Sequence, residues 1–595
     1  MRNRVGKGGA FGGPWRDDAV VRAEQLGPVL KVRAVAGTHV ILLAWDFVHQ
    51  PKVKMGKPLP ASVADLLGFA VERERLDAGG AVVERSVLKG IKRFKDKDAG
   101  LPPGTPVRTD EHPVQSFLWG DYTVEPETTY VYTVTPVHGT PKLLDVRAAD
   151  ATTVTITTEP RRDARAGVPA QHDLYFNRGV IGSQAFAREF QNVDPSGDDP
   201  TSPPMVWLSH GLYEGFLSFL GEALDETYAL RGAFYEFHYQ PAVNAFGAAA
   251  ERGVDVKIVY EAEGGKGSYK DVNETALSNA NLLHPDIAIP RTVKTGIRHN
   301  KFAVLLHDDH PIAVWTGSTN ISEGGIFGHA NVGHLVRDAD LAATYLSYWE
   351  DLAGDPAIAA LRKKALALTP TPAGDPPEGV IPLFSPRDPA KSTTTLDWYA
   401  NRIAGAARLV CISFAFNFDE VFQQVLDPES DVLRYIVKDD DLGTGESVGH
   451  DHDLLFAAGG YLDPGALTNF LAEMANPLNS NRYIHTKILL VDPMGADPLV
   501  VSGSANFSRP SQQSNDENML VIRGDTRVAD CYLGEFMRIF DHHYARYVVK
   551  KIATSSGPDP DAGYLKTTAA EWLPSNFDPR SYKPKRRKYF TETPA

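Results

Sequence analysis

The stretch that decides the fold is residues 483–518, which read YIHTKILLVDPMGADPLVVSGSANFSRPSQQSNDEN. An earlier stretch, residues 299–331, repeats its polar positions with the same spacing. In both, a Lys, a Ser, an Asn and a further polar residue follow the first His at +2, +19, +21 and +32. The matching residues are His299, Lys301, Ser318, Asn320 and Asn331 in the first copy and His485, Lys487, Ser504, Asn506 and Glu517 in the second. This agreement between segments 186 residues apart indicates an internal duplication.

The elements expected around each copy repeat as well. Hydrophobic residues recur about every 3.6 residues in some segments and every 2 residues in others, and this alternation is typical of α/β units. The first half predicts helix 217–224, strand 233–239, helix 243–252, strand 254–260, strand 301–306 and helix 341–352. The second half predicts helix 396–406, strand 408–416, helix 419–426, strand 432–437, strand 487–491 and helix 528–544. We therefore expect two α/β lobes related by a pseudo-twofold axis, at residues 205–366 and 391–550, joined by the Pro-rich linker 367–390.

The N-terminal part has a different pattern. Residues 1–27 are rich in Gly and charge and predict a flexible arm. Period-two alternation of Val, Tyr and Thr over residues 28–160 predicts a β-sandwich. Trp45 and Tyr130 in this segment resemble the core Trp and the tyrosine corner of a fibronectin type III domain. We expect a linker at 161–204 and a C-terminal extension at 551–595 with a solvated basic tail at 583–588.

Bulk composition limits the classes of function. A chain of 595 residues is too long to fold around a single hydrophobic core, so we expect several domains. A hydrophobic content of 43% is ordinary for a globular protein. A net charge of −14 means that any phosphate site is a local basic pocket. Two isolated cysteines, Cys411 and Cys531, disfavour a disulfide framework or a cysteine metal site. No secretory signal and no membrane-spanning run is visible, so we expect a cytoplasmic protein, with export by a non-classical route left open.

The duplicated residues suit phosphate chemistry. Residues two apart on a strand project from the same face, so each His lies beside its Lys. The Gly-Ser-x-Asn turns add hydroxyl, amide and backbone N–H groups. Two lobes together offer one imidazole to attack phosphorus and another to protonate the leaving oxygen. The two lysines supply the positive charge, so we expect neither a metal nor a cofactor.

These residues resemble the paired His-x-Lys-x4-Asp signatures of the phospholipase D superfamily, over about residues 205–550. The resemblance implies cleavage of a phosphodiester through a covalent phosphohistidine, with water or an alcohol as acceptor. Asp492 completes the second signature, whereas Leu306 replaces the Asp of the first. In the family a carboxylate of one lobe orients the His of the other, so we expect Glu517 beside His299 and Asn331 beside His485. A carboxylate-paired imidazole is the more basic, which makes His299 the expected nucleophile and His485 the acid.

The substrate is less well determined by sequence. Apolar segments near the motifs, at 326–327, 414–416 and 461–462, favour a phospholipid and a peripheral membrane contact, with a nuclease acting on DNA or RNA as the alternative. A catalytically weak phosphate- or lipid-binding protein is the third reading. The polar clusters 307–310, 450–453 and 541–543 are weighed as metal ligands, but solvated loops or packing are preferred. Because one chain holds both lobes, we expect a monomer to be active.

Overall fold

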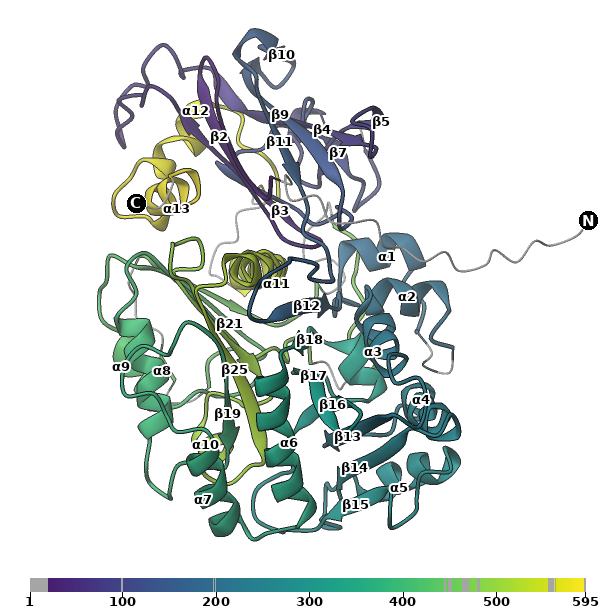
Figure 1. Cartoon of the computed structure of the whole chain (residues 1–595). Coiled ribbons are helices and arrows are strands. Elements are labelled where there is room, and N and C mark those ends of the chain that lie inside the picture. The colour runs from purple at the N-terminus through teal and green to yellow at the C-terminus, as the bar shows by residue number, and fades with distance from the viewer. Residues whose placement is uncertain are drawn as a thin grey trace, which may run out of the picture.

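The computed structural model describes residues 20–97, 100–195, 197, 199–443, 446–447, 452–462, 470–478, 482–554, 561 and 563–592, with the side chains of 552–554 excepted. Figure 1 shows a sheet-rich N-terminal part above two α/β lobes. Of the arm predicted at 1–27, residues 1–19 lie outside the described residues. Arg22–Leu26 form an edge strand, β1, which pairs with β2.

The N-terminal part consists of two sheets over a common core. Alternate side chains of both sheets, such as Trp45, Phe69 and Tyr132, are fully buried in this core, as period-two alternation predicts. One sheet has the order β1 (Arg22–Leu26), β2 (Leu30–Ala36), β3 (Ile41–Phe47), β8 (Leu118–Asp121); the other has the order β10 (Leu143–Val146), β9 (Thr129–Thr140), β4 (Leu66–Leu76), β5 (Val82–Val87), and β11 (Thr152–Thr157) also pairs with β9. A small ribbon joins β6 (Lys89–Gly90) and β7 (Val107–Arg108).

The first lobe is built on a seven-stranded sheet. Its order is β12 (Gln171–Phe176), β18 (Val332–Arg337), β17 (His310–Gly317), β16 (Lys301–His307), β13 (Tyr228–Phe234), β14 (Asp255–Glu261), β15 (Ala288–Arg291). Its helices are α1 (Gln184–Phe190), α2 (Pro203–Ser209), α3 (Leu212–Leu220), α4 (Gln240–Glu251), α5 (Lys270–Asn279), α6 (Ala339–Ala353) and α7 (Ile358–Leu368). The edge strand β12 lies in the segment 161–204 that was predicted as a linker.

The second lobe repeats this sheet. Its order is β19 (Gly379–Ser385), β25 (Glu517–Arg523), β24 (Leu499–Gly503), β23 (Ile488–Val491), β20 (Leu409–Phe414), β21 (Leu433–Lys438), β22 (Leu454–Ala458). Its helices are α8 (Thr394–Ala404), α9 (Glu420–Leu426), α10 (Arg509–Gln513) and α11 (Thr526–Thr554). In both lobes the fifth strand of this order, β13 or β20, is parallel to one neighbour and antiparallel to the other. The duplication seen in the sequence therefore extends to strand order and direction.

Several element boundaries differ from the sequence prediction, and the helix predicted at 528–544 is α11, which runs on to Thr554. Two further differences have a common cause. The strand predicted at 233–239 is β13, which ends at Phe234. The alternating apolar residues that follow it leave the sheet: Phe237 pairs in isolation with Ile321, and Tyr239 precedes α4. The helix predicted at 217–224 is α3, which ends before Gly221. Both errors arose because alternating or periodic apolar residues continue past the end of the element.

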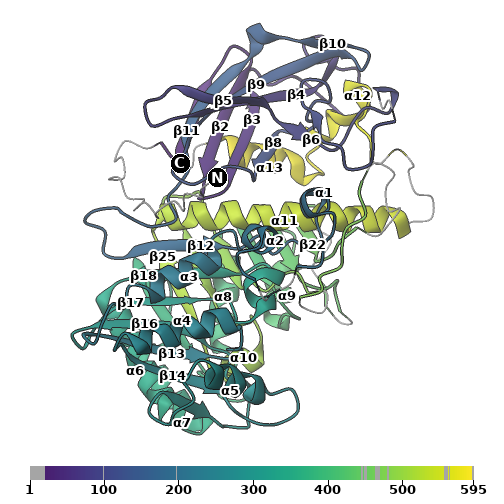
Figure 2. The same ribbon diagram turned by 90° about the vertical axis from the view of Figure 1, so that its right-hand side faces the viewer.

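The C-terminal segment returns to the N-terminal sheets. The long helix α11 lies between those sheets and the lobes (Figure 2). Beyond it, α12 (Ala569–Trp572) packs near β4 and α13 (Tyr582–Thr591) packs on β3. The tail predicted at 583–588 to be solvated is therefore a docked helix. Its Arg587 is buried and donates to Asp46 at 2.9 Å. No helix within the described ranges has the length and apolarity to cross a bilayer.

Candidate active site

The two His-x-Lys pairs meet where the lobes face each other. Lys301 begins β16 and Lys487 immediately precedes β23, so each His lies just outside its strand. The rings of His299 and His485 have their centroids 6.1 Å apart at an interplanar angle of 75°. Both histidines and both lysines are buried. The two imidazoles are therefore close enough for both to act on one bound group.

His299 is held by a carboxylate from the other lobe. Its Nδ1 lies 2.9 Å from Glu517 Oε2, and Asn515 donates to the second carboxylate oxygen at 2.9 Å. Because a carboxylate accepts, Nδ1 carries the proton and Nε2 is left for chemistry. Burial and Lys301 lower the pKa of His299 to about 4, with Glu517 acting in the opposite direction. The ring is therefore a neutral nucleophile at pH 7.

His485 has an amide where His299 has a carboxylate. Its Nδ1 lies 3.2 Å from Asn331 Oδ1 and 3.2 Å from the carbonyl oxygen of Ser318, both in the first lobe. The same Oδ1 accepts the hydroxyl of Ser318 at 2.7 Å. Burial and Lys487 lower the pKa of His485 well below its usual value. The site is thus asymmetric: one imidazole faces a negative charge, and the other faces neutral oxygens.

The two lysines are buried cations. The Nζ of Lys301 donates to the carbonyl of His299, and that of Lys487 donates to the carbonyl of His485. Burial lowers the pKa of Lys301 to about 7, and burial with Lys301 lowers that of Lys487. Clustered buried cations of this kind favour an anion strongly, because its charge offsets both their desolvation and their mutual repulsion.

The Ser and Asn residues of the turns differ in availability. Ser318 Oγ accepts from the backbone N–H of Val332 at 3.1 Å, and Ser504 Oγ accepts from that of Asn518 at 3.0 Å. These hydroxyls thus hold the strands that carry Asn331 and Glu517. In contrast, the side-chain oxygens of Asn320 and Asn506 are buried without a hydrogen-bond partner in the described part of the chain. Because an amide oxygen only accepts, these two atoms suit a donor such as water or an alcohol rather than a phosphate oxygen.

Asp492 is not brought to the site, contrary to the sequence prediction. Its carboxylate accepts the backbone N–H groups of Ala407, Arg408 and Leu409 at 2.7–2.9 Å. It follows β23 at the end opposite Lys487, which is roughly 16 Å away at about 3.3 Å per residue. Leu306, at the matching place in β16, is a buried core residue. The missing Asp of the first signature thus removes no group from the site.

Several residues near the site were missed from the sequence. His329 stacks parallel on His485 with centroids 4.6 Å apart, and its Nδ1 is 3.0 Å from Asn331 Nδ2. Tyr235 contacts the ring of His299 edge-on at 5.1 Å, and Lys301 Nζ lies 5.3 Å from the Tyr235 centroid. His329 precedes Asn331 by two residues in the extended segment before β18, and this nearness to a motif residue is the signal that would have found it. Tyr235 follows a different strand, and nothing in the sequence places it here.

The metal alternatives receive no support from geometry. His307 and Asp308 lie at the β16–β17 turn, and His542 lies on α11. Of the cluster 450–453, His450 and Asp451 lie outside the described residues. Where side chains are described, no three His, Cys, Asp or Glu groups converge in a way that could hold a metal ion.

The comparisons with known proteins centre on the duplicated segments. The family model described as "Cardiolipin synthase, PLD-like domain" matches residues 220–352 and 465–540. No curated protein matches the chain. Similar solved structures include phosphatidylserine synthase from Haemophilus influenzae Rd KW20, at 14% identity and a TM-score of 0.40 over 65% of this chain and 94% of that one. Another is Nuc, a phospholipase D family member from Salmonella typhimurium, at 20% identity and a TM-score of 0.21 over 31% and 95%.

Polyphosphate kinase from Porphyromonas gingivalis is also similar, at 12% identity and a TM-score of 0.36 over 91% of this chain and 82% of that one. The two segments that the family model matches hold both histidines, both lysines and the Glu517 and Asn331 that face them. These two segments are therefore similar to the PLD-like domain that the family model describes.

Proposed function

We propose that the chain is a metal-independent phosphodiesterase that works through a covalent phosphohistidine. The single observation that carries this proposal is the pair of facing histidines, one held by Glu517 and the other by Asn331. Nε2 of His299 attacks phosphorus, and the bond from phosphorus to the leaving oxygen breaks. His485 gives its proton to that oxygen. Water, or an alcohol in a transfer reaction, then gives a proton to His485 and displaces His299 from phosphorus.

The low pKa of free His485 fits this scheme only when substrate is bound. With the site empty, Lys487, His329 and His299 oppose a further positive charge. A phosphodiester anion between the lobes offsets these charges, which favours protonation of His485 beside the substrate. Binding and proton uptake are therefore coupled, and the acid forms where it is needed.

A phospholipid is the substrate that we favour. Phe416 is 38% exposed and its ring lies 6.5 Å from that of His485. An apolar side chain would therefore contact the substrate beside its phosphate. Arg482 covers the same ring at 4.6 Å, which adds a cation for an anionic headgroup or surface. The alternative is a nuclease, because an exposed ring with a stacked guanidinium is also a platform for a base.

Activity assays separate these candidates. The protein, in EDTA, is incubated with phosphatidylcholine vesicles and separately with single- and double-stranded DNA and RNA. We expect choline release that is lost in His299→Ala. Shortened strands, lost in the same variant, would instead establish a nuclease. If the folded protein acts on none of these and still binds vesicles, it is a phosphate- or lipid-binding protein and the proposed reaction is wrong.

We also infer a fibronectin type III-like fold for the N-terminal sheets. Trp45 is fully buried, and the hydroxyl of Tyr130 accepts the backbone N–H of Glu125 at 2.9 Å, five residues upstream, as in a tyrosine corner. Tyr130→Phe removes only this acceptor, so we expect the free energy of unfolding to fall by about 1 kcal/mol. An unchanged denaturation midpoint would contradict the tyrosine corner.

A further inference from the structure

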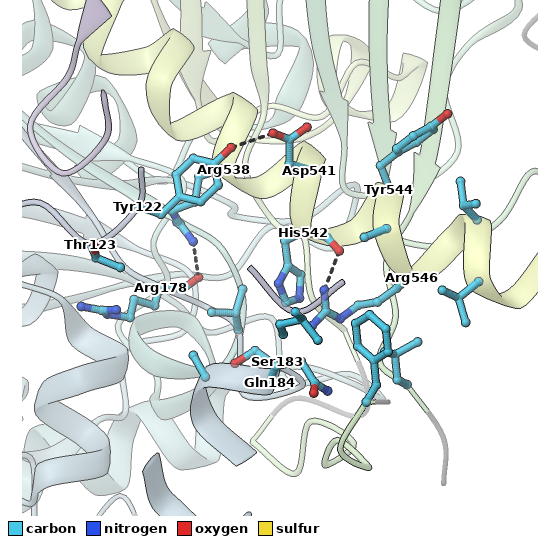
Figure 3. Close-up of a pocket in the computed structure, with 18 of the residues that line it drawn as sticks. Tyr122, Thr123, Arg178, Ser183, Gln184, Arg538, Asp541, His542, Tyr544 and Arg546 are labelled. Atoms are coloured by element: carbon cyan, nitrogen blue, oxygen red, sulfur yellow. Dashed lines mark hydrogen bonds between the residues drawn. The ribbon is translucent and has the colours of Figure 1, made fainter. Parts of the chain in front are cut away.

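A cavity of about 590 Å³ lies between the N-terminal part, the first lobe and α11. Figure 3 shows Tyr122 and Thr123 from the N-terminal part, Ser183 and Gln184 at the start of α1, and several residues of α11 around it. The volume is within the range of about 300–1,000 Å³ that small-molecule sites occupy. Neither His299 nor His485 lines this cavity, so it is a place distinct from the proposed active site.

Most of the cavity wall is apolar. Val180 and Trp207 line it from the first lobe, and Val548 and Val549 line it from α11. Such a wall offers no hydrogen bonds to water and favours a ligand with an apolar body. The cavity is formed by parts far apart in the sequence, so an occupant would contact the N-terminal part and the lobes together.

Most charged groups of the cavity lining already have partners. Arg538 donates to Glu535 at 2.7 Å, Arg546 binds Glu473, and Asp541 accepts the hydroxyl of Tyr122 at 2.7 Å (Figure 3). Each of these charged side chains therefore has a partner within the protein and needs no charged ligand group.

Arg178 differs from these residues. Its guanidinium lies 4.4 Å from the Trp207 centroid, and its Nε is buried without a hydrogen-bond partner. Within the described residues no carboxylate forms an ion pair with it, and Glu125 and Glu535 act on it only at longer range. Burial lowers its pKa to about 10, which reflects the cost of a cation held in this environment. An anionic ligand group would supply the missing partner, and a guanidinium binds a carboxylate or phosphate through two hydrogen bonds.

We propose that this cavity binds a single-chain anionic amphiphile, such as a long-chain fatty acid or a lysophospholipid, with its acid group on Arg178 and its chain along α11. The proposal stands on the cavity alone and does not depend on the proposed reaction. Hydrogen bonds also connect the cavity lining to the proposed active site. Arg538, in the lining, donates to the carbonyl of Asn177, whose amide donates to the carbonyl of His329 at 2.9 Å.

Displacement of a fluorescent polyene fatty acid from the full-length protein tests the proposal. The competitors are oleate, oleoyl-lysophosphatidic acid, methyl oleate and hexanoate. We expect both long-chain anions to displace the probe, and the neutral ester and the short acid to do so at least about tenfold more weakly. The stronger of the two long-chain anions identifies the headgroup that the cavity prefers.

Three variants assign the binding to the cavity. Arg178→Gln should weaken oleate about tenfold or more and leave methyl oleate unchanged. Ala545→Trp, at an alanine that lines the cavity from α11, should fill it and abolish both. Arg580→Gln, at an exposed ion pair elsewhere, is the matched control and should bind like the original protein. Each variant is checked for an unchanged melting temperature.

The outcomes that overturn the proposal are a probe that does not bind, an ester that competes as well as the acid, or oleate affinity that Arg178→Gln does not alter. His299→Ala, which cannot run the proposed reaction, should bind the probe normally. Failure of catalysis and failure of this site are therefore told apart in one experiment.

Discussion

Glu517 and Asn331 stand at the same place in the two copies, yet they give their histidines different chemistry. A carboxylate on Nδ1 of His299 stabilises the positive charge that its ring acquires when Nε2 bonds to phosphorus. An amide oxygen on Nδ1 of His485 orients that ring without neutralising a charge. This asymmetry supports the proposal that His299 attacks phosphorus and His485 transfers the proton.

Replacing Glu517 tests this division. Glu517→Gln is expected to lower kcat by about 100-fold, because the amide cannot stabilise a cationic His299, and to leave KM nearly unchanged because Glu517 does not face the phosphate. Steady-state kinetics with bis(p-nitrophenyl) phosphate measures both. Asn331→Asp is the matched variant and should move the basic limb of the pH profile upward. A Glu517→Gln enzyme with unaltered kcat would contradict the assignment.

Lys301 sets a pH limit on binding. Its pKa of about 7 means that the ammonium form is present below pH 7 and is lost as the pH rises through that value. Affinity for dimethyl phosphate, whose charge is constant, should therefore fall above pH 7, by up to about tenfold per pH unit. Calorimetric titration of His299→Ala from pH 6 to 9 measures this. Constant affinity up to pH 9, or the same fall in Lys301→Gln, would show that Lys301 is not responsible.

At the scale of the element, β16 and β23 carry the site at one end and a turn at the other. Asp492 closes the far turn of β23 by accepting three backbone N–H groups, whereas the far turn of β16 uses Asp308, whose N–H donates to Thr227. The residues of one signature therefore have two separate roles. The His and Lys act on the ligand, and the Asp stabilises the lobe.

Asp492→Asn is expected to destabilise the protein by about 1–3 kcal/mol, because an uncharged side chain accepts the three N–H groups less well. The kcat of the folded variant should not change. Denaturant unfolding and kinetics on the same preparation measure the two effects. Leu306→Asp, which restores the Asp of the first signature, should lower stability without raising kcat. A large loss of kcat in folded Asp492→Asn would mean that Asp492 does contribute to catalysis.

Sequence spacing located most of the site residues. The positions at +2, +19, +21 and +32 located both histidines, both lysines, Asn331 and Glu517, because a duplicated strand pair places equivalent residues at equivalent points. Which histidine each of the last two faces was expected from the family resemblance. Strand length, at about 3.3 Å per residue, already implied that Asp492 lies far from Lys487. Of the edge strands, only a short ordered piece at 174–176, within β12, was predicted, and β19 was not. Each is a short run among Pro and Gly residues whose partner lies over a hundred residues away.

At the scale of the whole molecule, the chain closes on itself. After the lobes, α13 returns to the N-terminal sheets, where Arg587 binds Asp46 and lies over Phe577 at 4.0 Å and Phe117 at 5.3 Å. Composition suggested a solvated tail because it does not show which of the basic residues find a buried carboxylate. The N-terminal part is thereby held to the C-terminal helices by a buried ion pair.

Arg587→Ala should destabilise the protein by about 3 kcal/mol, because it leaves Asp46 buried without its partner. Burial already raises the pKa of Asp46, and loss of the guanidinium should raise it further. Arg580→Ala, at an exposed pair in the same segment, is the control and should have little effect. Thermal unfolding compares them. Equal melting temperatures for the two variants would mean that the docked helix contributes nothing to stability.

Trapping the covalent intermediate shows directly whether His299 is the nucleophile. The protein is mixed with a diester carrying ³²P, quenched within milliseconds in base, which preserves phosphohistidine, and digested for peptide mapping. We expect label on the peptide that contains His299, none in His299→Ala, and persistent label in a variant that lacks His485. Label on the peptide that contains His485, or turnover without any labelled peptide, would contradict the account.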